Sequence, residues 1–432
     1  MNNIKNLIAL TLIALIYSCG NQADITSDPQ VATNLEELVE AQDFFRLKKT
    51  YSDNVDELSE LHALYYSAII NNVFNNAEKS NDAIDNLLVN YQSSLSDSML
   101  NELYRTKLLN HINLYEYGEA AKASDFIQTN YLSLNDSSEI ATLQNEIKIW
   151  KALENTPKQQ IIKTDDAIIP MVRDKVGLFN IDVTFGDVTK NLLFDTGANF
   201  SVIIKSLATE LGFSIIEADF YVTAATGKKV KSEIAVADEL IIGGITCKNV
   251  IFLILDDKDL SFPQIDYYIN GAIGFPVIEA LDEIRINKEN QIFVPKIPVE
   301  YTFNNFALVG LMPIVAAEYK EDTLIFHFDT GATTTSLYPK FCNDYKQEIE
   351  DNYEKETFTS SSGGGMMQFE GYIINNLTLS VGDSEATLDS LRLHIENIGG
   401  EESNFHGNFG QDYIKQFDEM IISFKHSSVT FK

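Results

Sequence analysis

The chain has 432 residues, of which 45% are apolar and 22% are charged. This composition is that of an average globular protein and excludes a largely disordered or fibrous chain. The length exceeds what one hydrophobic core usually supports, so two or three domains are expected. The formal net charge of −31 excludes nucleic acid as a favourable partner, because phosphate backbones must be neutralised by Lys and Arg.

The N-terminus has the pattern of a targeting segment. Lys5 is followed by an apolar run over residues 7–17, too short to cross a bilayer, since a spanning helix needs about 20 apolar residues. The run ends at Ser18, directly before Cys19, and this arrangement resembles the lipobox of bacterial lipoproteins. The resemblance implies a signal peptide over residues 1–19 and a lipid on Cys19. It places the protein in the bacterial cell envelope, anchored to a membrane outside the cytoplasm.

A polar stretch over residues 20–33 follows and is expected to be a tether. A buried N-terminal helix is the alternative interpretation of the apolar run, but an apolar run followed by a polar stretch fits anchoring better. Two or more acyl chains hold a protein stably on a membrane, whereas one chain binds only marginally.

Residues 34–156 have helical periodicity and few glycines, which predicts a domain of about six helices. Within this domain the segment 64–91 returns as 103–131. Such a repeat suggests stacked helical hairpins. It resembles tetratricopeptide repeats loosely, and an ordinary helical bundle is the alternative. No catalytic constellation lies in this domain, so we expect it to be a scaffold or a docking surface for a protein partner.

From residue 161 the pattern changes to short apolar runs broken by Gly, Asp and Asn, which is typical of a mostly β structure. A second repeat is much stronger here. Three elements return in the same order and at nearly the same spacing: Val-Gly-Leu at 176–178 and 309–311, Phe-Asp-Thr-Gly-Ala at 194–198 and 328–332, and Gly-x-x-Gly at 271–274 and 407–410. The sequence therefore predicts two lobes with the same fold, over residues 161–298 and 299–432.

Each Asp-Thr-Gly follows an apolar run and is itself followed, at nearly the same distance in both copies, by the Gly-x-x-Gly element. This combined pattern resembles the retropepsin-like aspartic proteases, particularly the bacterial tandem forms that carry two Asp-Thr-Gly lobes in one chain. The resemblance covers about residues 161–432. It implies two mostly-β lobes related by a pseudo-two-fold axis, a hydrolase acting on peptides or proteins, and no cofactor.

Asp195 and Asp329 are the predicted catalytic residues. Two carboxyl groups held close share one proton, because both cannot ionise side by side, so the pair supplies one acid and one base. The resemblance implies that the ionised member takes a proton from water while the protonated member donates to the scissile carbonyl, without a covalent intermediate. One Asp-Thr-Gly could simply form an Asx turn. Two copies in register favour a catalytic pair.

The resemblance also assigns supporting roles within the two loops. Thr196 and Thr330 match the family positions whose hydroxyl groups bond to the opposite loop and lock the pair. Gly197 and Gly331 allow the two loops to approach without a clash from a Cβ atom.

Gly274 and Gly410 match the glycine of an element that packs behind each aspartate loop, and their expected role is structural. The second lobe departs from the family pattern at Asn408, which is polar where the family is apolar. We therefore expect the two aspartates to be supported differently.

Hairpins that close over an extended substrate are expected about 25 to 40 residues after each aspartate. The first would turn at Thr226 and Gly227, and the second would contain Gly364 and Met366. The glycine run of the second hairpin is not followed by the Lys-Ser or Lys-Thr of a phosphate-binding loop, so a flap is favoured.

The six histidines have no metal-ligand spacing with one another or with cysteine, so no metal is predicted. Without Cys19, only Cys247 and Cys342 remain, which does not indicate a disulfide framework.

The fullest prediction is an aspartic endopeptidase anchored in the envelope. Two alternatives stay open: a non-catalytic peptide-binding receptor on a peptidase fold, and an assembly scaffold that acts through the helical domain. Fold alone does not decide between them. The presence of both aspartates favours the enzyme.

Overall fold

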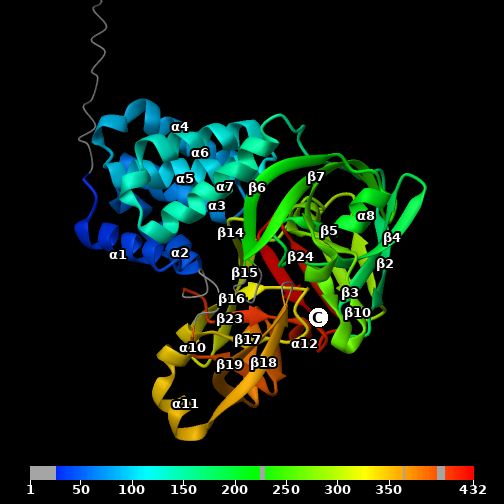
Figure 1. Ribbon diagram of the computed structural model, residues 1–432. Coiled ribbons are helices and arrows are strands. Elements are labelled where there is room, and N and C mark those ends of the chain that lie inside the picture. The colour runs from blue at the N-terminus through cyan, green and yellow to red at the C-terminus, as the bar shows by residue number, and fades with distance from the viewer. Residues whose placement is uncertain (1–25, 224–228, 363–364, 397–403) are drawn as a thin grey trace, which may run out of the picture.

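The structure is a computed structural model that describes residues 26–223, 229–362, 365–396 and 404–432. A helical domain is followed by two β-rich lobes (Figure 1), which confirms the predicted fold class. The predicted signal peptide and Cys19 lie outside the described residues. No helix within the described ranges combines the length and the apolar character needed to span a membrane.

Seven α-helices form the helical domain in the described part of the chain: α1 (Pro29–Glu40), α2 (Phe44–Asn54), α3 (Glu60–Val73), α4 (Ala77–Asn90), α5 (Asp97–Asn113), α6 (Tyr117–Asn130) and α7 (Ser137–Leu153). The first helix begins before residue 34, where the domain was expected to start. Asp28 caps it by accepting hydrogen bonds from the amides of Gln30 and Val31, and Pro29 suits the first helical turn. The predicted tether over residues 20–33 is therefore too long.

The internal repeat of the helical domain is present as stacked hairpins (Figure 1). Helices α4 and α6 begin at Ala77 and Tyr117, and helices α5 and α7 begin at Asp97 and Ser137, so the two pairs are offset equally along the chain. The resemblance to tetratricopeptide repeats stays a prediction.

Lobe 1 contains helices α8 (Lys205–Glu210) and α9 (Phe275–Glu279) and strands β1 (Gln160–Ile162), β2 (Ala167–Arg173), β3 (Phe179–Phe185), β4 (Val188–Phe194), β5 (Ser201–Ile204), β6 (Ile215–Thr223), β7 (Lys229–Ile242), β8 (Ile245–Leu255), β9 (Ser261–Phe262), β10 (Tyr267–Tyr268), β11 (Gly271–Ile273), β12 (Glu283–Asn287) and β13 (Gln291–Val294). Strand β11 lies between β4 and β5, parallel to β4 and antiparallel to β5.

Lobe 2 contains helices α10 (Pro339–Asp344), α11 (Lys346–Asn352) and α12 (Gln411–Ile414) and strands β14 (Phe306–Val309), β15 (Met312–Tyr319), β16 (Asp322–Phe328), β17 (Ser336–Leu337), β18 (Lys355–Ser362), β19 (Gly365–Ile374), β20 (Leu377–Val381), β21 (Ser384–Leu388), β22 (Leu391–His394), β23 (Gly407–Phe409), β24 (Glu419–Ser423) and β25 (Ser428–Phe431). Strand β23 lies between β16 and β17 as β11 lies between β4 and β5.

The two lobes share one sheet. The C-terminal strands β24 and β25 leave lobe 2 and extend the sheet of lobe 1 through β12, in the order β25-β24-β12-β13-β2. Residues 283–287 pair antiparallel with residues 419–423, and Arg285 pairs with Ile421 at the centre. These two residues correspond in the repeat that aligns Gly271 with Gly407, so each strand pairs with its own counterpart. The pseudo-two-fold axis therefore passes through this central pair.

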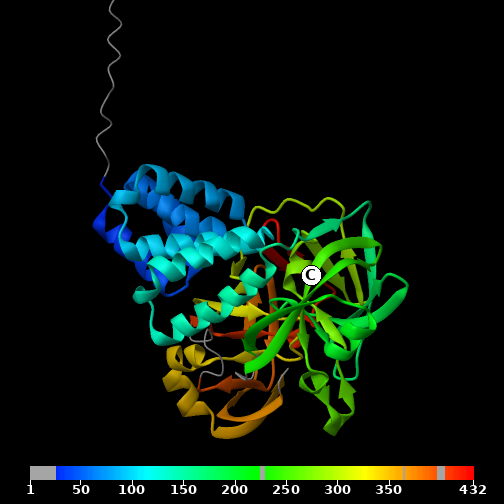
Figure 2. The ribbon, with the colours of Figure 1, turned by 45° about the horizontal axis from the view of Figure 1, so that its top comes forward.

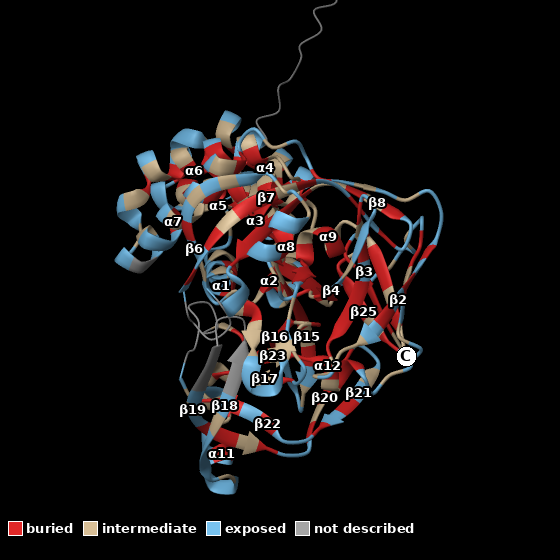
Figure 3. Cartoon of the chain, turned by 45° about the vertical axis from the view of Figure 1, so that its right-hand side comes forward, coloured by how far each residue is buried: buried red, intermediate tan, exposed pale blue. Residues whose placement is uncertain are grey.

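The helical domain lies against the β-rich part of the chain (Figure 2) and shares hydrophobic cores with both lobes. Trp150 of α7 packs in one buried cluster with Phe220 and Ile234 of lobe 1. Leu47 of α2 belongs to another buried cluster that includes Ile325 of lobe 2. In Figure 3 the helices are exposed on their outer faces, and their buried residues face inward. The domain is thus an integral part of the folded unit rather than a separate appendage.

Two turns of the helical domain also contact lobe 1 through polar side chains. Asn75 and Tyr115 lie at equivalent places in the repeat and both have left-handed φ angles, 58° and 56°. Both donate to the carboxyl group of Glu279, over 2.8 Å and 2.9 Å. Tyr115 also donates to the carbonyl of Pro276 at 2.8 Å. The two equivalent turns of the repeat therefore each direct a hydrogen-bond donor at the last residue of helix α9.

We predict that Tyr115→Phe destabilises the protein by roughly 1 to 2 kcal/mol, because a buried carbonyl and carboxyl group each lose a hydrogen bond. The shift in the midpoint of urea unfolding measures this loss. Tyr104→Phe is the matched control: its ring stacks within the same helix pair, and its hydroxyl group has no hydrogen bond among the described residues. Equal midpoints for the two variants would contradict the assigned role of Tyr115.

Candidate active site

Each aspartate lies at the end of a central strand, in a loop held by the strand beside it. The amide of Asp195 donates to the carbonyl of Ile273 at 3.0 Å, and the amide of Asp329 donates to the carbonyl of Phe409 at 3.1 Å. These acceptors end β11 and β23, the strands that run parallel to β4 and β16. The same local fold therefore positions both carboxyl groups.

Reciprocal hydrogen bonds between two buried threonines lock the loops together. The Thr196 hydroxyl donates to the carbonyl of Phe328 at 3.0 Å and accepts from the amide of Thr330 at 3.0 Å. The Thr330 hydroxyl donates to the carbonyl of Phe194 at 2.9 Å and accepts from the amide of Thr196 at 3.0 Å. Four bonds thus cross the pseudo-two-fold axis.

The loop glycines leave room for the opposite carboxyl group. A Cβ atom at Gly197 would lie 2.5 Å from the carboxyl carbon of Asp329, and one at Gly331 would lie 2.5 Å from that of Asp195. Real Cβ atoms do not approach so closely, so both positions require glycine. The structure brings the two predicted catalytic residues together, each against the glycine of the other lobe.

Gly274 and Gly410 lie directly after the strands β11 and β23, which hold the aspartate loops. A Cβ atom at either would meet backbone atoms at 2.4 Å or 2.5 Å, at Phe200 in lobe 1 and at Thr334 in lobe 2. The amide of Gly274 donates to the hydroxyl group of Ser201, and the amide of Gly410 donates to that of Thr335.

The environment of the pair favours retention of a proton. Burial, then repulsion from Asp329, raises the pKa of Asp195 well above its ordinary value. Burial also raises the pKa of Asp329, but hydrogen bonds donated by the Gly331 amide and the Asn408 side chain oppose the rise. Two such carboxyl groups titrate as one coupled unit that holds a shared proton over a wide pH range.

The two loops are not identical, as the polar Asn408 led us to expect. Its amide nitrogen donates to Oδ2 of Asp329 at 3.3 Å, whereas lobe 1 has Ala272 at the corresponding position. Sequence reasoning missed a second difference, at Gln411. Its amide donates to the carbonyl of Thr330 at 2.8 Å, and its oxygen accepts a hydrogen bond from Arg173 of lobe 1. No local pattern marks this long-range bridge.

Sequence reasoning also missed the contact between the helical domain and the first aspartate loop. Phe200, five residues after Asp195, packs against Trp150 with ring centroids 5.9 Å apart. Trp150 is the single tryptophan of the chain and its ring is buried in α7. A single tryptophan in a domain without a catalytic motif was the only signal in the sequence.

Two hairpins are present where flaps were predicted. Strands β6 and β7 pair up to Thr223 and Lys229, and strands β18 and β19 pair up to Ser362 and Gly365. Thr226, Gly227 and Gly364 lie outside the described residues, as does the side chain of Met366.

The helical domain binds the first hairpin through a side chain of α7. Asn145 of α7 donates to the carbonyl of Tyr221 at 2.7 Å and accepts from its amide at 2.9 Å. The side chain therefore pairs with the free edge of β6 as a neighbouring strand would.

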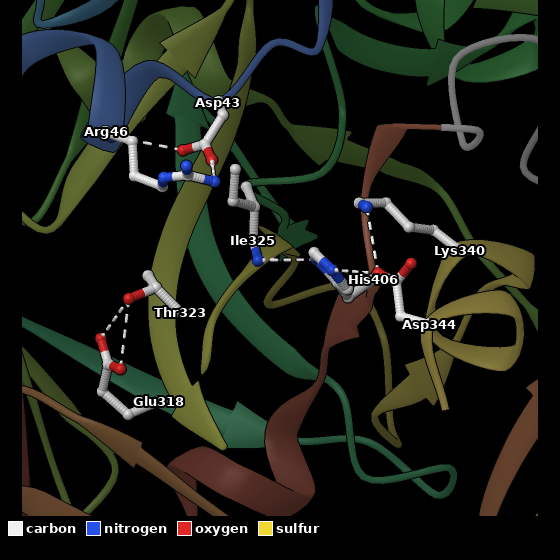
Figure 4. A network of polar contacts seen from close by, with 8 residues as sticks. All are labelled: Asp43, Arg46, Glu318, Thr323, Ile325, Lys340, Asp344 and His406. Carbon is white, nitrogen blue, oxygen red and sulfur yellow. Dashed lines mark hydrogen bonds and ion pairs between the residues drawn. The ribbon is translucent and has the colours of Figure 1, made fainter. Parts of the chain in front are cut away.

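His406, the residue directly before β23, holds the start of this strand in place through two side-chain contacts (Figure 4). Nδ1 of His406 accepts from the amide of Ile325 at 2.9 Å, and Nε2 lies 3.1 Å from Asp344. Burial is the main cause that lowers the pKa of His406. These contacts fix the strand that carries Asn408. Across the described ranges, no group of three or more His, Cys, Asp or Glu residues is arranged to hold a metal ion.

Comparison with known proteins identifies one region of similarity. A family model described as aspartyl protease matches residues 181–277. The matched range runs from β3 into α9 and contains the first aspartate loop and the glycine element behind it. No curated protein matches the chain. Lobe 1 is therefore similar to aspartyl proteases in sequence, and lobe 2 has the matching loop geometry.

We predict that Thr330→Val destabilises the protein by roughly 2 to 3 kcal/mol, since a buried amide and a buried carbonyl each lose their partner. Thr330→Ser retains the hydroxyl group and should unfold close to the wild type. Thr387→Val, at an exposed hydroxyl pair in the same lobe, controls for the substitution itself. Chemical unfolding of the three variants measures the difference. Wild-type stability in Thr330→Val would show that the crossed bonds do not hold the lobes.

Proposed function

We propose that this protein is an aspartic endopeptidase in which Asp195 and Asp329 activate a water molecule. One observation carries the proposal: each carboxyl group lies against the glycine of the opposite loop, and crossed threonine bonds fix the two loops. The similarity of residues 181–277 to aspartyl proteases supports the same chemistry. Substrates are peptides or proteins bound in extended form between the lobes and the two hairpins.

The reaction needs only the shared proton of the pair. The ionised carboxylate takes a proton from water as the water oxygen attacks the scissile carbonyl carbon, and the protonated carboxyl donates to the carbonyl oxygen. The resulting diol then collapses: the amine leaves with the proton taken from water, and the other carboxyl regains its own. Each turnover therefore returns the pair to its starting state without a covalent intermediate.

Two other functions compete with this proposal. A peptide receptor would bind peptides between the same lobes without turnover, and an assembly scaffold would act through the helical domain. Against the receptor, a binding site gains nothing from two half-buried carboxyl groups that repel each other. Against the scaffold, α7 and the turn residue Tyr115 already contact lobe 1.

The first test is incubation of the purified protein with a diverse peptide mixture, followed by mass spectrometry. Cleaved peptides over a mildly acidic to neutral pH range are expected. Peptides that remain intact at every pH would favour the receptor.

We predict that Asp195→Asn and Asp329→Asn each reduce peptide turnover by at least about 1,000-fold, because neither lobe holds a second carboxyl group that can replace the loss. Circular dichroism should show both variants folded, since Asn has the same shape as Asp and removes the repulsion. A folded variant that keeps near wild-type turnover would show that catalysis lies elsewhere.

The same variants should reveal the pH dependence of the pair. Ala198 and Ala332 follow the loop glycines and provide no hydroxyl group to favour the charged forms. Folding raises the pKa of both aspartates, so the protonated pair stabilises the fold at low pH, and this contribution is lost as pH rises through the raised values. Activity should peak at mildly acidic to neutral pH, and the stability advantage of Asp195→Asn should grow as pH increases.

We also propose that the protein is anchored to the cell envelope through a lipid on Cys19, as the short apolar run before Ser18 suggests. Cys19→Ala should move the protein from the membrane fraction to the soluble fraction, because the thiol that accepts the lipid is gone. Fractionation followed by immunoblotting measures this. Continued membrane association of Cys19→Ala with unchanged processing would exclude the lipid anchor.

A further inference from the structure

The two aspartate loops make nearly the same hydrogen bonds. The Gly197 amide donates to Oδ1 of Asp195 at 2.9 Å, and the Gly331 amide donates to Oδ1 of Asp329 at 2.7 Å. Both loops continue with alanine, whose side chain provides no donor and whose amide acts on the carboxyl group in the same way in each lobe. One side chain breaks this equivalence.

Asn408 is that side chain. It lies in β23, where its neighbour across the ladder is His327, and its amide nitrogen reaches Oδ2 of Asp329 at 3.3 Å. The corresponding residue of lobe 1, Ala272, occupies the same place in β11 and has no group to donate. A donor beside one carboxyl group stabilises its charged form, whereas the other group receives no such help.

We infer that Asn408 places the negative charge of the pair on Asp329, so that Asp329 is the general base and Asp195 the general acid. The inference deepens the proposed function and rests on it. Asn408 acts as a positioning residue, because it reaches the reaction only through the carboxyl group that it bonds. In the first step Asp329 takes the proton of the attacking water, and Asp195 donates its proton to the carbonyl oxygen.

The nearby titratable groups do not oppose this assignment. Among the main causes that shift the two pKa values, the one charged group is the partner aspartate. The ring of His327 packs against Tyr338 and Phe405, and burial lowers its pKa to about 4, so it is neutral where the enzyme works. Arg173 reaches the second loop only through Gln411.

The pH profile of kcat/KM separates this role from a structural one. The donor lowers the pH at which the pair loses its first proton and leaves the second loss nearly unchanged, since Asp329 is charged before and after it. Asn408→Ala and Asn408→Leu should therefore shift the acidic limb of the profile to higher pH by about one unit and leave the alkaline limb at the same pH. Ala is the residue that lobe 1 itself uses, and Leu keeps the size of Asn.

The chain also offers a reciprocal variant. Ala272→Asn would add a donor beside Asp195, which should move the alkaline limb down by a similar amount and leave the acidic limb nearly unchanged. Combining Ala272→Asn with Asn408→Ala should restore both limbs, because one donor then faces one carboxyl group again. If Asn408 had only a packing role, these substitutions would not shift the acidic limb in one variant and the alkaline limb in the other, and the double variant would not restore both.

A measurement that does not need turnover covers variants that lose activity, and its wild-type result holds even if an Asn408 variant fails to fold. In protein labelled with ¹³C at the Asp carboxyl carbons, the signals of the pair are assigned by their loss in Asp195→Asn and Asp329→Asn. The Asp329 signal should titrate first in the wild type, and the two should titrate together in Asn408→Ala.

The two failures are distinct. Absence of peptide cleavage by the wild type would defeat the proposed function, while the titration order would still report on Asn408. An unmoved acidic limb in active Asn408→Ala and Asn408→Leu, or an Asp195 signal that titrates first in the wild type, would overturn the inference.

Discussion

The structure depends on holding together two carboxyl groups that repel each other. Burial makes the repulsion stronger, because fewer water molecules screen the charges. The crossed bonds of Thr196 and Thr330 oppose it by fixing the loops from behind, with backbone groups of both lobes as partners. Glycine on each side then lets the carboxyl groups meet.

The supports form layers around that contact. Strands β11 and β23 hold the aspartate backbones, and the shared sheet joins the lobes at the pairing of Arg285 with Ile421. The helical domain adds a third support: it contacts both lobes, and it reaches the first aspartate loop through Trp150 against Phe200 and helix α9 through Tyr115. A symmetric pair of loops is therefore embedded in an asymmetric protein. The asymmetry gives the two carboxyl groups different surroundings and hence different chemistry.

Much of the site could be predicted from the sequence because its parts are local and occur twice. The two Asp-Thr-Gly loops, the glycines behind them and the departure at Asn408 are all visible as a repeat in register. The contacts of Gln411, Tyr115 and Trp150 could not be predicted in this way. They join segments far apart in the chain, and neither periodicity nor a motif marks their partners. The early start of α1 was missed because its cap, Asp28, lies inside a polar stretch that reads as a linker.

The central claim is that both carboxyl groups of one active site come from the same chain. Mixing Asp195→Asn with Asp329→Asn at equal concentration tests it most directly, across dilutions that would allow or prevent association. If each site forms within one chain, the wild type cleaves peptides with a specific activity independent of concentration, and the mixture stays inactive at every dilution. Recovery of turnover in the mixture, increasing with protein concentration, would show that the catalytic pair forms between chains and would contradict this account.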